Sequence, residues 1–181
     1  MKPLEEFTDA ELFLNRELSQ LAFNFRVLEQ ARDESIPLLE RLKYLCISCT
    51  NLDEFFEIRA ATVKTAMQYK APLLPDNMDP QLALERIYAL SNKLVHEQYA
   101  LWNETLRPEL SDAGIHILGR ETWTSTKKRW LHDYFKNEIM PVLSPLALDP
   151  AHPFPQILNK SLNVAVILEG KDAYGRRGGI A

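Results

Sequence analysis

Cysteine, positive charge and long apolar runs are all scarce in this sequence of 181 residues, and each scarcity excludes a class of protein. Two cysteines cannot form the disulfide framework of a small secreted domain. The apolar runs, such as Val164 to Leu168, fall far short of the roughly 20 residues that a membrane-spanning helix needs. The first residues hold no apolar segment of the kind that directs secretion. We therefore expect a cytoplasmic protein.

The charge balance argues against a nucleic-acid partner. The sequence has 21 basic and 25 acidic side chains, and its net charge is −4. A domain that binds nucleic acid usually carries a basic excess or a basic face. The apolar content of 46% and the charged content of 25% are those of an ordinary globular protein, so we expect a folded chain.

The motifs of common nucleotide and metal sites are missing. The sequence contains no Walker or GxGxxG loop, no nucleophile elbow and no HExxH pair. Cys46 and Cys49 have CxxC spacing, but zinc normally takes four ligands and no second pair exists. The four histidines are scattered: His96, His116, His132 and His152. We expect the cysteines to be small apolar residues of a helix core and predict no metal site; a redox or metal role is the alternative.

Helical periodicity dominates the chain as far as Gly114. An apolar stripe at helical spacing follows Asn15 and Ser19, either of which can cap a first helix. A second helix is predicted to start at Ser35–Pro37 and to bend or break at Thr50–Asn51, two poor helix formers. A third long helix is predicted from Asp79–Pro80 to the glycine C-cap. Together these segments predict a small antiparallel helical bundle.

The pattern changes after the third helix. Ile115–Leu118 predicts a short strand, and a helix that carries Trp130 is predicted to end at Pro141. The β-branched run Leu162–Leu168 is typical of a buried strand. Glycines then predict a hairpin connection, and Ile180–Ala181 resembles the opening of a second strand.

These two patterns predict an α+β fold in two domains. Residues 1–118 are expected to form an N-terminal antiparallel helical bundle, and residues 119–181 the truncated start of an α/β domain. A lone edge strand is a poor place for a domain to end, so we expect the sequence to be a fragment of a longer protein.

The most informative stretch runs from Thr50 to Arg59. Its polar members beside a strongly apolar segment are Asn51, Asp53, Glu54 and Arg59. Two interpretations stay open on these residues alone. Asn51 either caps a helix start with the charges facing solvent, or offers its amide to a purine edge or ribose. Helix N–H groups near such a start would favour an anionic ligand.

Three blocks of sequence resemble the opening of the type 1 polyphosphate kinases, in the order and at about the spacing of that family. They are FLNRELSxLxFNxRVL at 13–28, PLLERL at 37–42 and NLDEFFEIR at 51–59. Segments around Trp130 and Leu162 resemble the start of the family's head domain, so the resemblance covers nearly the whole chain. The sequence departs from the family at Gln20, where relatives often have an aromatic residue, and at Phe25, where many have an acidic one.

The resemblance implies an enzyme that transfers the terminal phosphate of ATP reversibly to inorganic polyphosphate through a phosphohistidine. In that family the histidine and the magnesium ligands lie in later domains, and no histidine of this chain matches. We therefore assign no catalytic residue and expect the chain alone to be inactive. Asn51 matches the family position that contacts the nucleotide. Asp53, Glu54 and Arg59 match the same motif and are expected to shape the pocket wall.

The resemblance also implies the partners of the complete enzyme. ATP or ADP and polyphosphate are its substrates, Mg²⁺ is expected without ligands in this chain, and the head domain is expected to form a homo-oligomer. The implied location is the cytoplasm, with peripheral membrane association left open. A non-catalytic helical interaction module derived from the same family is the alternative.

Overall fold

The computed structural model describes residues 13–69, 76, 78–146, 148, 153–171 and 177–180. The chain divides into two compact units, Met1–Ile117 and Leu118–Ala181. Each of the two units has its own internal packing.

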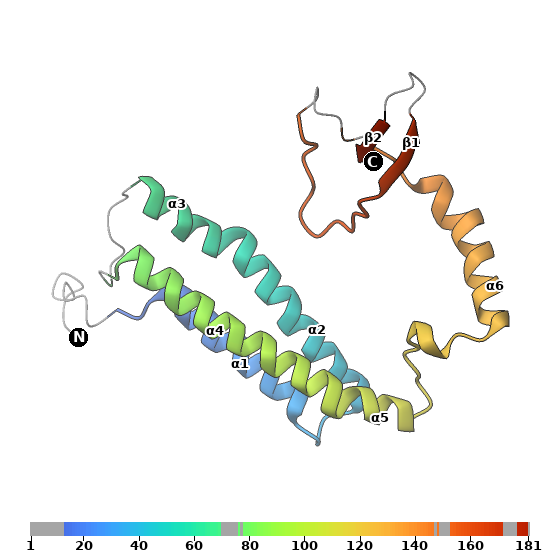
Figure 1. The fold of residues 1–181 in the computed structure, drawn as a ribbon. Helices are drawn as coiled ribbons and strands as arrows, with labels where there is room; N and C mark the ends of the chain where they lie inside the picture. Colours follow the sequence, from blue (N-terminus) through green and yellow to red (C-terminus); the bar gives the residue numbers. More distant parts are fainter. Residues whose placement is uncertain are drawn as a thin grey trace. The chain divides into compact units, whose positions relative to one another are not determined.

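Long helices side by side make up the described part of the first unit (Figure 1). Their bounds are α1, Arg16–Arg32; α2, Leu38–Glu54, continued by the π-helical η3, Phe55–Ala60, and by α3, Ala61–Tyr69; and α4, Pro80–Leu101, continued by the π-helical η4, Trp102–Leu106, and by α5, Arg107–Asp112. Helix α1 packs against α2 and α4, and α3 packs against α4. The predicted N-terminal helical bundle is confirmed.

Three of the predicted capping residues lie at helix ends, whereas α2 begins after Pro37 with no side-chain cap. The Oδ1 of Asn15 accepts a hydrogen bond from the backbone amide of Leu18 at 3.0 Å, which caps α1. Asp79 caps α4 through its side chain in the same way. Gly114, at φ 83°, adopts the left-handed conformation that ends many helices. Local chemistry therefore sets where the helices begin and end.

Leucine dominates the core of this unit. The buried apolar side chains of its main cluster are Leu21, Leu28, Ala31, Leu45, Leu52, Phe55, Ala60, Val63, Ala83, Leu84, Ile87, Leu94, Leu101 and Leu106. Full burial of one large apolar side chain contributes about 1.5–3 kcal/mol before entropy is counted. All the long helical segments contribute to this cluster, which holds them together as one body.

The predicted core position of Cys46 and Cys49 is wrong, because both are exposed. The buried face of α2 is formed by Leu45, Ser48 and Leu52. Each cysteine follows one of these positions by a single residue, which rotates it by about 100° around the helix axis. Serine takes the interior position because its polar groups find partners there.

The predicted bend at Thr50–Asn51 is also wrong. Helix α2 continues through both residues to Glu54, and π-helical hydrogen bonding begins only at Phe55. Poor helix formers cost at most about 0.7 kcal/mol each, less than the burial of Leu52 and Phe55 contributes. Asn51 is therefore not a helix cap. The backbone N–H groups around it are used inside the helix, which removes the expected attraction for anions.

The second unit combines short helices with a two-stranded sheet. Its elements are the 3₁₀ turn η5, Arg120–Thr122; α6, Ser125–Tyr134; the π-helical η6, Phe135–Ile139; the 3₁₀ turn η7, Met140–Val142; and the strands β1, Ile167–Lys171, and β2, Arg177–Ile180. The strands pair antiparallel, with Ile167 opposite Ile180. The helix predicted around Trp130 is present as α6.

Two predictions about strands in this part of the chain are wrong. Ile115–Leu118 forms no strand in the described structure, and its apolar side chains are exposed. The run Leu162–Leu168 enters β1 only at its end, and Leu162 is 95% exposed rather than buried. A β-branched run becomes a buried strand only where other elements cover it, and none of the second unit's residues whose side chains the structure describes is buried. None of the described helices is long and apolar enough to cross a bilayer.

Candidate functional site

A small depression of about 100 Å³ opens beside Asn51 on the helical unit. Its lining residues are Gln20, Leu21, Phe23, Asn24, Asn51 and Phe55. Leu21 and Phe55 are buried, so the floor is apolar, whereas Gln20 and Phe23 are exposed. The polar groups around the depression are therefore uncharged amides, which can donate and accept hydrogen bonds.

Behind this depression, the leucine core contains one buried polar side chain from each of α1, α2 and α4. These residues, Asn24, Ser48 and Gln98, form a polar layer, and at most 5% of each is exposed. The Nδ2 of Asn24 donates to the backbone oxygen of Ser48 at 2.9 Å. The Nε2 of Gln98 donates to the Oγ of Ser48 at 2.8 Å. Because an unpaired buried amide costs about 1–3 kcal/mol, these bonds favour one register of the three helices.

Asn51 lies at the outer end of the polar layer. It is half-buried, and its Nδ2 donates to the Oδ1 of Asn24 over 3.4 Å, a long hydrogen bond. The Oδ1 of Asn51 accepts no hydrogen bond from the residues that the structure describes. The depression therefore offers the Oδ1 of Asn51 as a free acceptor, while the Nδ2 of the same side chain is bonded to Asn24 in the core.

The other predicted site residues lie away from the depression. Asp53 and Glu54 are exposed near the end of α2, and Arg59 is half-buried on η3. None of the three is among the lining residues, so the structure brings only Asn51 there. Cys49 is exposed as a residue, but partial burial of its thiol raises the pKa of that group, and the neighbouring Cys46 and the carboxylate of Asp53 raise it further.

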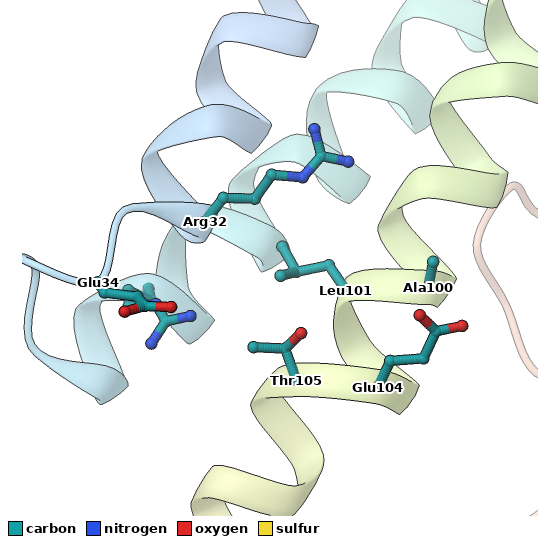
Figure 2. Close-up of a pocket in the computed structure, with 7 residues that line it drawn as sticks. Arg32, Glu34, Ala100, Leu101, Glu104 and Thr105 are labelled. Carbon is teal, nitrogen blue, oxygen red and sulfur yellow. The ribbon is translucent and has the colours of Figure 1, made fainter.

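A larger depression of about 300 Å³ lies where α1 ends and α2 begins (Figure 2). Its lining residues are Arg32, Glu34, Arg41, Ala100, Leu101, Glu104 and Thr105. Figure 2 shows Arg32 reaching from α1 toward α4, where its guanidinium donates to Glu97 at 2.8 Å. A second ion pair joins Arg32 to Glu29. The guanidinium group is thus already paired, and these ion pairs outweigh desolvation and shift the pKa of Arg32 above its ordinary value.

Arg41 is buried at the edge of this larger depression. Its Nε donates to the backbone oxygen of Ala31 at 3.0 Å, and its guanidinium pairs with Glu109 at 2.7 Å. The oxygen of Ala31 lies in the last turn of α1, where carbonyl groups lack partners inside the helix. Arg41 therefore joins three helical segments and has a structural role.

Metal ligation finds no support in the described structure. Its residues hold no group of three or more His, Cys, Asp or Glu side chains that could bind a metal ion. His96, His116 and His132 are exposed, and His152 lies outside the described residues. The described residues thus contain no cluster of three ligands that would hold a metal ion by itself.

Comparison with known proteins identifies the family. The model of the polyphosphate kinase N-terminal domain matches residues 13–118, and that of the polyphosphate kinase middle domain matches residues 126–181. The chain belongs to the polyphosphate kinase family. The predicted resemblance is confirmed.

Individual members of the polyphosphate kinase family cover nearly all of this chain. A polyphosphate kinase of Xylella fastidiosa is 59% identical over 177 residues, which are 98% of this chain and 25% of that protein. One from Pseudomonas aeruginosa is 51% identical over 174 residues, 96% of this chain and 25% of that protein. The crystal structure of polyphosphate kinase from Porphyromonas gingivalis is similar with a TM-score of 0.64 and 26% identity, over 91% of this chain and 24% of that one. The chain thus spans about a quarter of the length of these relatives.

The polar layer was missed at the level of sequence, although a signal for it exists. Each member lies at helical spacing between two buried leucines. The three sets are Leu21, Asn24 and Leu28; Leu45, Ser48 and Leu52; and Leu94, Gln98 and Leu101. Most buried polar residues find a partner inside the protein, although the hydroxyl of Ser91, between Ile87 and Leu94, has none among the described residues. The interruptions at Asn24, Ser48 and Gln98 are therefore a signal for contact between these residues.

Proposed function

We propose that this chain forms one wall of the nucleotide site of a polyphosphate kinase. In this proposal the complete enzyme transfers the terminal phosphate of ATP reversibly to inorganic polyphosphate, and Asn51 contacts the nucleotide. The phosphohistidine that carries the phosphate lies outside the 181 residues. Membership of the polyphosphate kinase family and the free acceptor of Asn51 support this proposal.

The size of the depression supports a wall rather than a whole site. Pockets that hold small ligands usually measure about 300–1,000 Å³, whereas the depression beside Asn51 measures about 100 Å³. It has room for an edge of a nucleotide base, and the exposed ring of Phe23 adds an apolar surface beside it. The rest of the nucleotide would be bound by residues beyond this chain. We propose that Asp53, Glu54 and Arg59, which lie outside this depression, shape the pocket wall of the complete enzyme.

We propose that the residues that carry out phosphoryl transfer lie in the rest of the enzyme. Catalysis of phosphoryl transfer depends mainly on positioning and on charge stabilisation, so a contact remote from the phosphates can affect turnover. The described residues contain no cluster of three or more metal-binding side chains, and we derive no step through a metal ion. We propose that residues 119–181 begin the α/β head domain and that residues 1–118 form the helical N-terminal domain, which supplies a wall of the nucleotide pocket. A cytoplasmic homo-oligomer remains a prediction.

Steady-state kinetics of the complete enzyme with Asn51→Ala test this function. Loss of one hydrogen bond to the nucleotide should raise KM for ATP about three- to tenfold and change kcat less. Asn92→Ala, which removes an exposed asparagine from α4, is the matched control and should leave both constants unchanged. An unchanged KM in Asn51→Ala would remove Asn51 from the site and favour a helical interaction module.

The isolated chain should make no polyphosphate, and turnover by it would contradict the proposed division of labour.

A further inference from the structure

We infer that Asn24 is a positioning residue that sets which edge of the Asn51 amide faces the ligand. This inference rests on the proposed function, in which Asn51 contacts the nucleotide. It assigns a role to Asn24, which lines the depression but is only 3% exposed. Each step follows from an oxygen atom that can accept hydrogen bonds but cannot donate them.

The first step fixes the orientation of Asn24. The backbone oxygen of Ser48 can only accept hydrogen bonds, so Asn24 must turn its NH₂ group toward it. In the opposite orientation two oxygens would face each other inside the core, where no water can separate them. Asn24 is 3% exposed and Ser48 is fully buried, so this constraint is strong. The Oδ1 of Asn24 is therefore directed away from Ser48.

The second step transfers this orientation to Asn51. The Oδ1 of Asn24 is also an acceptor only, and the group it meets is the Nδ2 of Asn51. The amide is planar, so the Oδ1 of Asn51 points away from Asn24 and is left for the ligand. An isolated, half-exposed asparagine could turn either edge outward. In this protein the backbone of Ser48, acting through Asn24, presents an acceptor.

The Oδ1 of Asn51, held in this orientation, should select a ligand that presents a hydrogen-bond donor. The 6-amino group of adenine donates a hydrogen bond, whereas the 6-oxo group of hypoxanthine accepts one. An acceptor held in place by the core should therefore favour ATP over ITP, which differ at that position. Once the orientation is lost, the amide of Asn51 can turn and serve either base.

The test compares KM for ATP and for ITP in the complete enzyme. The wild type should prefer ATP by about tenfold, which is the effect expected from one neutral hydrogen bond at a half-exposed group. Asn24→Leu, which has a similar shape and no hydrogen-bonding groups, should bring the ratio of the two KM values within about twofold of unity. Ser48→Ala keeps the backbone oxygen that holds Asn24 and removes only the hydroxyl that pairs with Gln98. This control should retain the wild-type ratio.

A role of Asn24 in stability alone would raise both KM values together or lower the amount of folded enzyme, and an unchanged ratio in Asn24→Leu would overturn the inference. If circular dichroism shows that Asn24→Leu does not fold, Asn24→Ala takes its place, because it adds no atoms to the core. The ratio of the two KM values should then fall within about twofold of unity in Asn24→Ala. Failure of the proposed function looks different, because Asn51→Ala would then leave KM for ATP unchanged. A raised KM in Asn51→Ala together with a wild-type ratio in the Asn24 variants would refute only the positioning role.

Discussion

The two depressions of the helical unit differ in what their polar groups already bind. Beside the larger one, of about 300 Å³, Arg32 pairs with Glu97 and buried Arg41 pairs with Glu109. Beside the smaller one, of about 100 Å³, Asn51 keeps a carbonyl oxygen without a protein partner among the described residues. A ligand that binds the two arginines of the larger depression would have to compete with these ion pairs, whereas Glu34 and Glu104, which also line it, have no partner among the described residues.

This difference concerns the two arginines, whose charges are already neutralised, and it favours the smaller depression on grounds other than volume. Charged groups that are buried and paired have already lost their hydration, and separating them leaves a charge without compensation. The amide of Asn51 requires no such separation. The smaller depression is therefore the better candidate for a ligand, and the larger one is better explained as a structural joint. Variants at each depression can test both assignments.

Replacement of Arg41 should have the largest effect on stability. Arg41→Met removes the donor of the Ala31 oxygen and the partner of Glu109, and should lower the free energy of unfolding by about 3 kcal/mol. Urea denaturation of the chain measures this change. Arg107→Met, at an exposed position of α5, is the matched control and should have little effect. KM for ATP in the complete enzyme should stay the same, and a large rise in KM for Arg41→Met alone would place the ligand at the larger depression.

Loss of the Ser48 hydroxyl should have the next largest effect. Ser48→Ala leaves the Nε2 of buried Gln98 without its partner and should lower the free energy of unfolding by about 2 kcal/mol. The double variant Ser48→Ala/Gln98→Met removes both polar groups and should recover most of that loss. The same denaturation experiment gives the coupling energy of the pair. Additive losses would show that the two side chains do not bond to each other.

The parts of this fold that depend on neighbouring residues could be predicted, and those that depend on distant partners could not. Asn15, Asp79 and Gly114 mark helix ends because a cap uses groups within a few residues. By contrast, the burial of Ser48 depends on Gln98, which lies 50 positions away. From residue type alone, Cys46 and Cys49 were predicted to lie in the helix core, whereas the structure buries Ser48 of α2 instead.

The same distinction applies to the candidate site. Asn51 was predicted from a local block of sequence that resembles a family, and the structure places it at a depression. Asn24 was missed because its role depends on a hydrogen bond across two helices. The prediction of a bend at Thr50–Asn51 failed for the same reason, because tertiary packing of α2 outweighs weak local preferences. Sequence therefore predicted the proposed contact residue and missed the residues that orient it.

The smallest predicted effect concerns the surface of α2 next to the polar layer. Burial, Cys46 and the carboxylate of Asp53 all raise the pKa of Cys49, so its thiol is harder to ionise in the folded chain than in the unfolded one. Ionisation at high pH therefore favours the unfolded chain, and stability should fall as the pH rises through the ordinary pKa of a thiol. In a Cys46→Ala background, Asp53→Asn should speed alkylation of Cys49 by iodoacetamide roughly twofold or less, because solvent screens this charge. Glu104→Gln, at the larger depression, is the matched control and should leave the rate unchanged. An equal increase in both variants would mean that overall charge, and not the neighbouring carboxylate, controls the thiol.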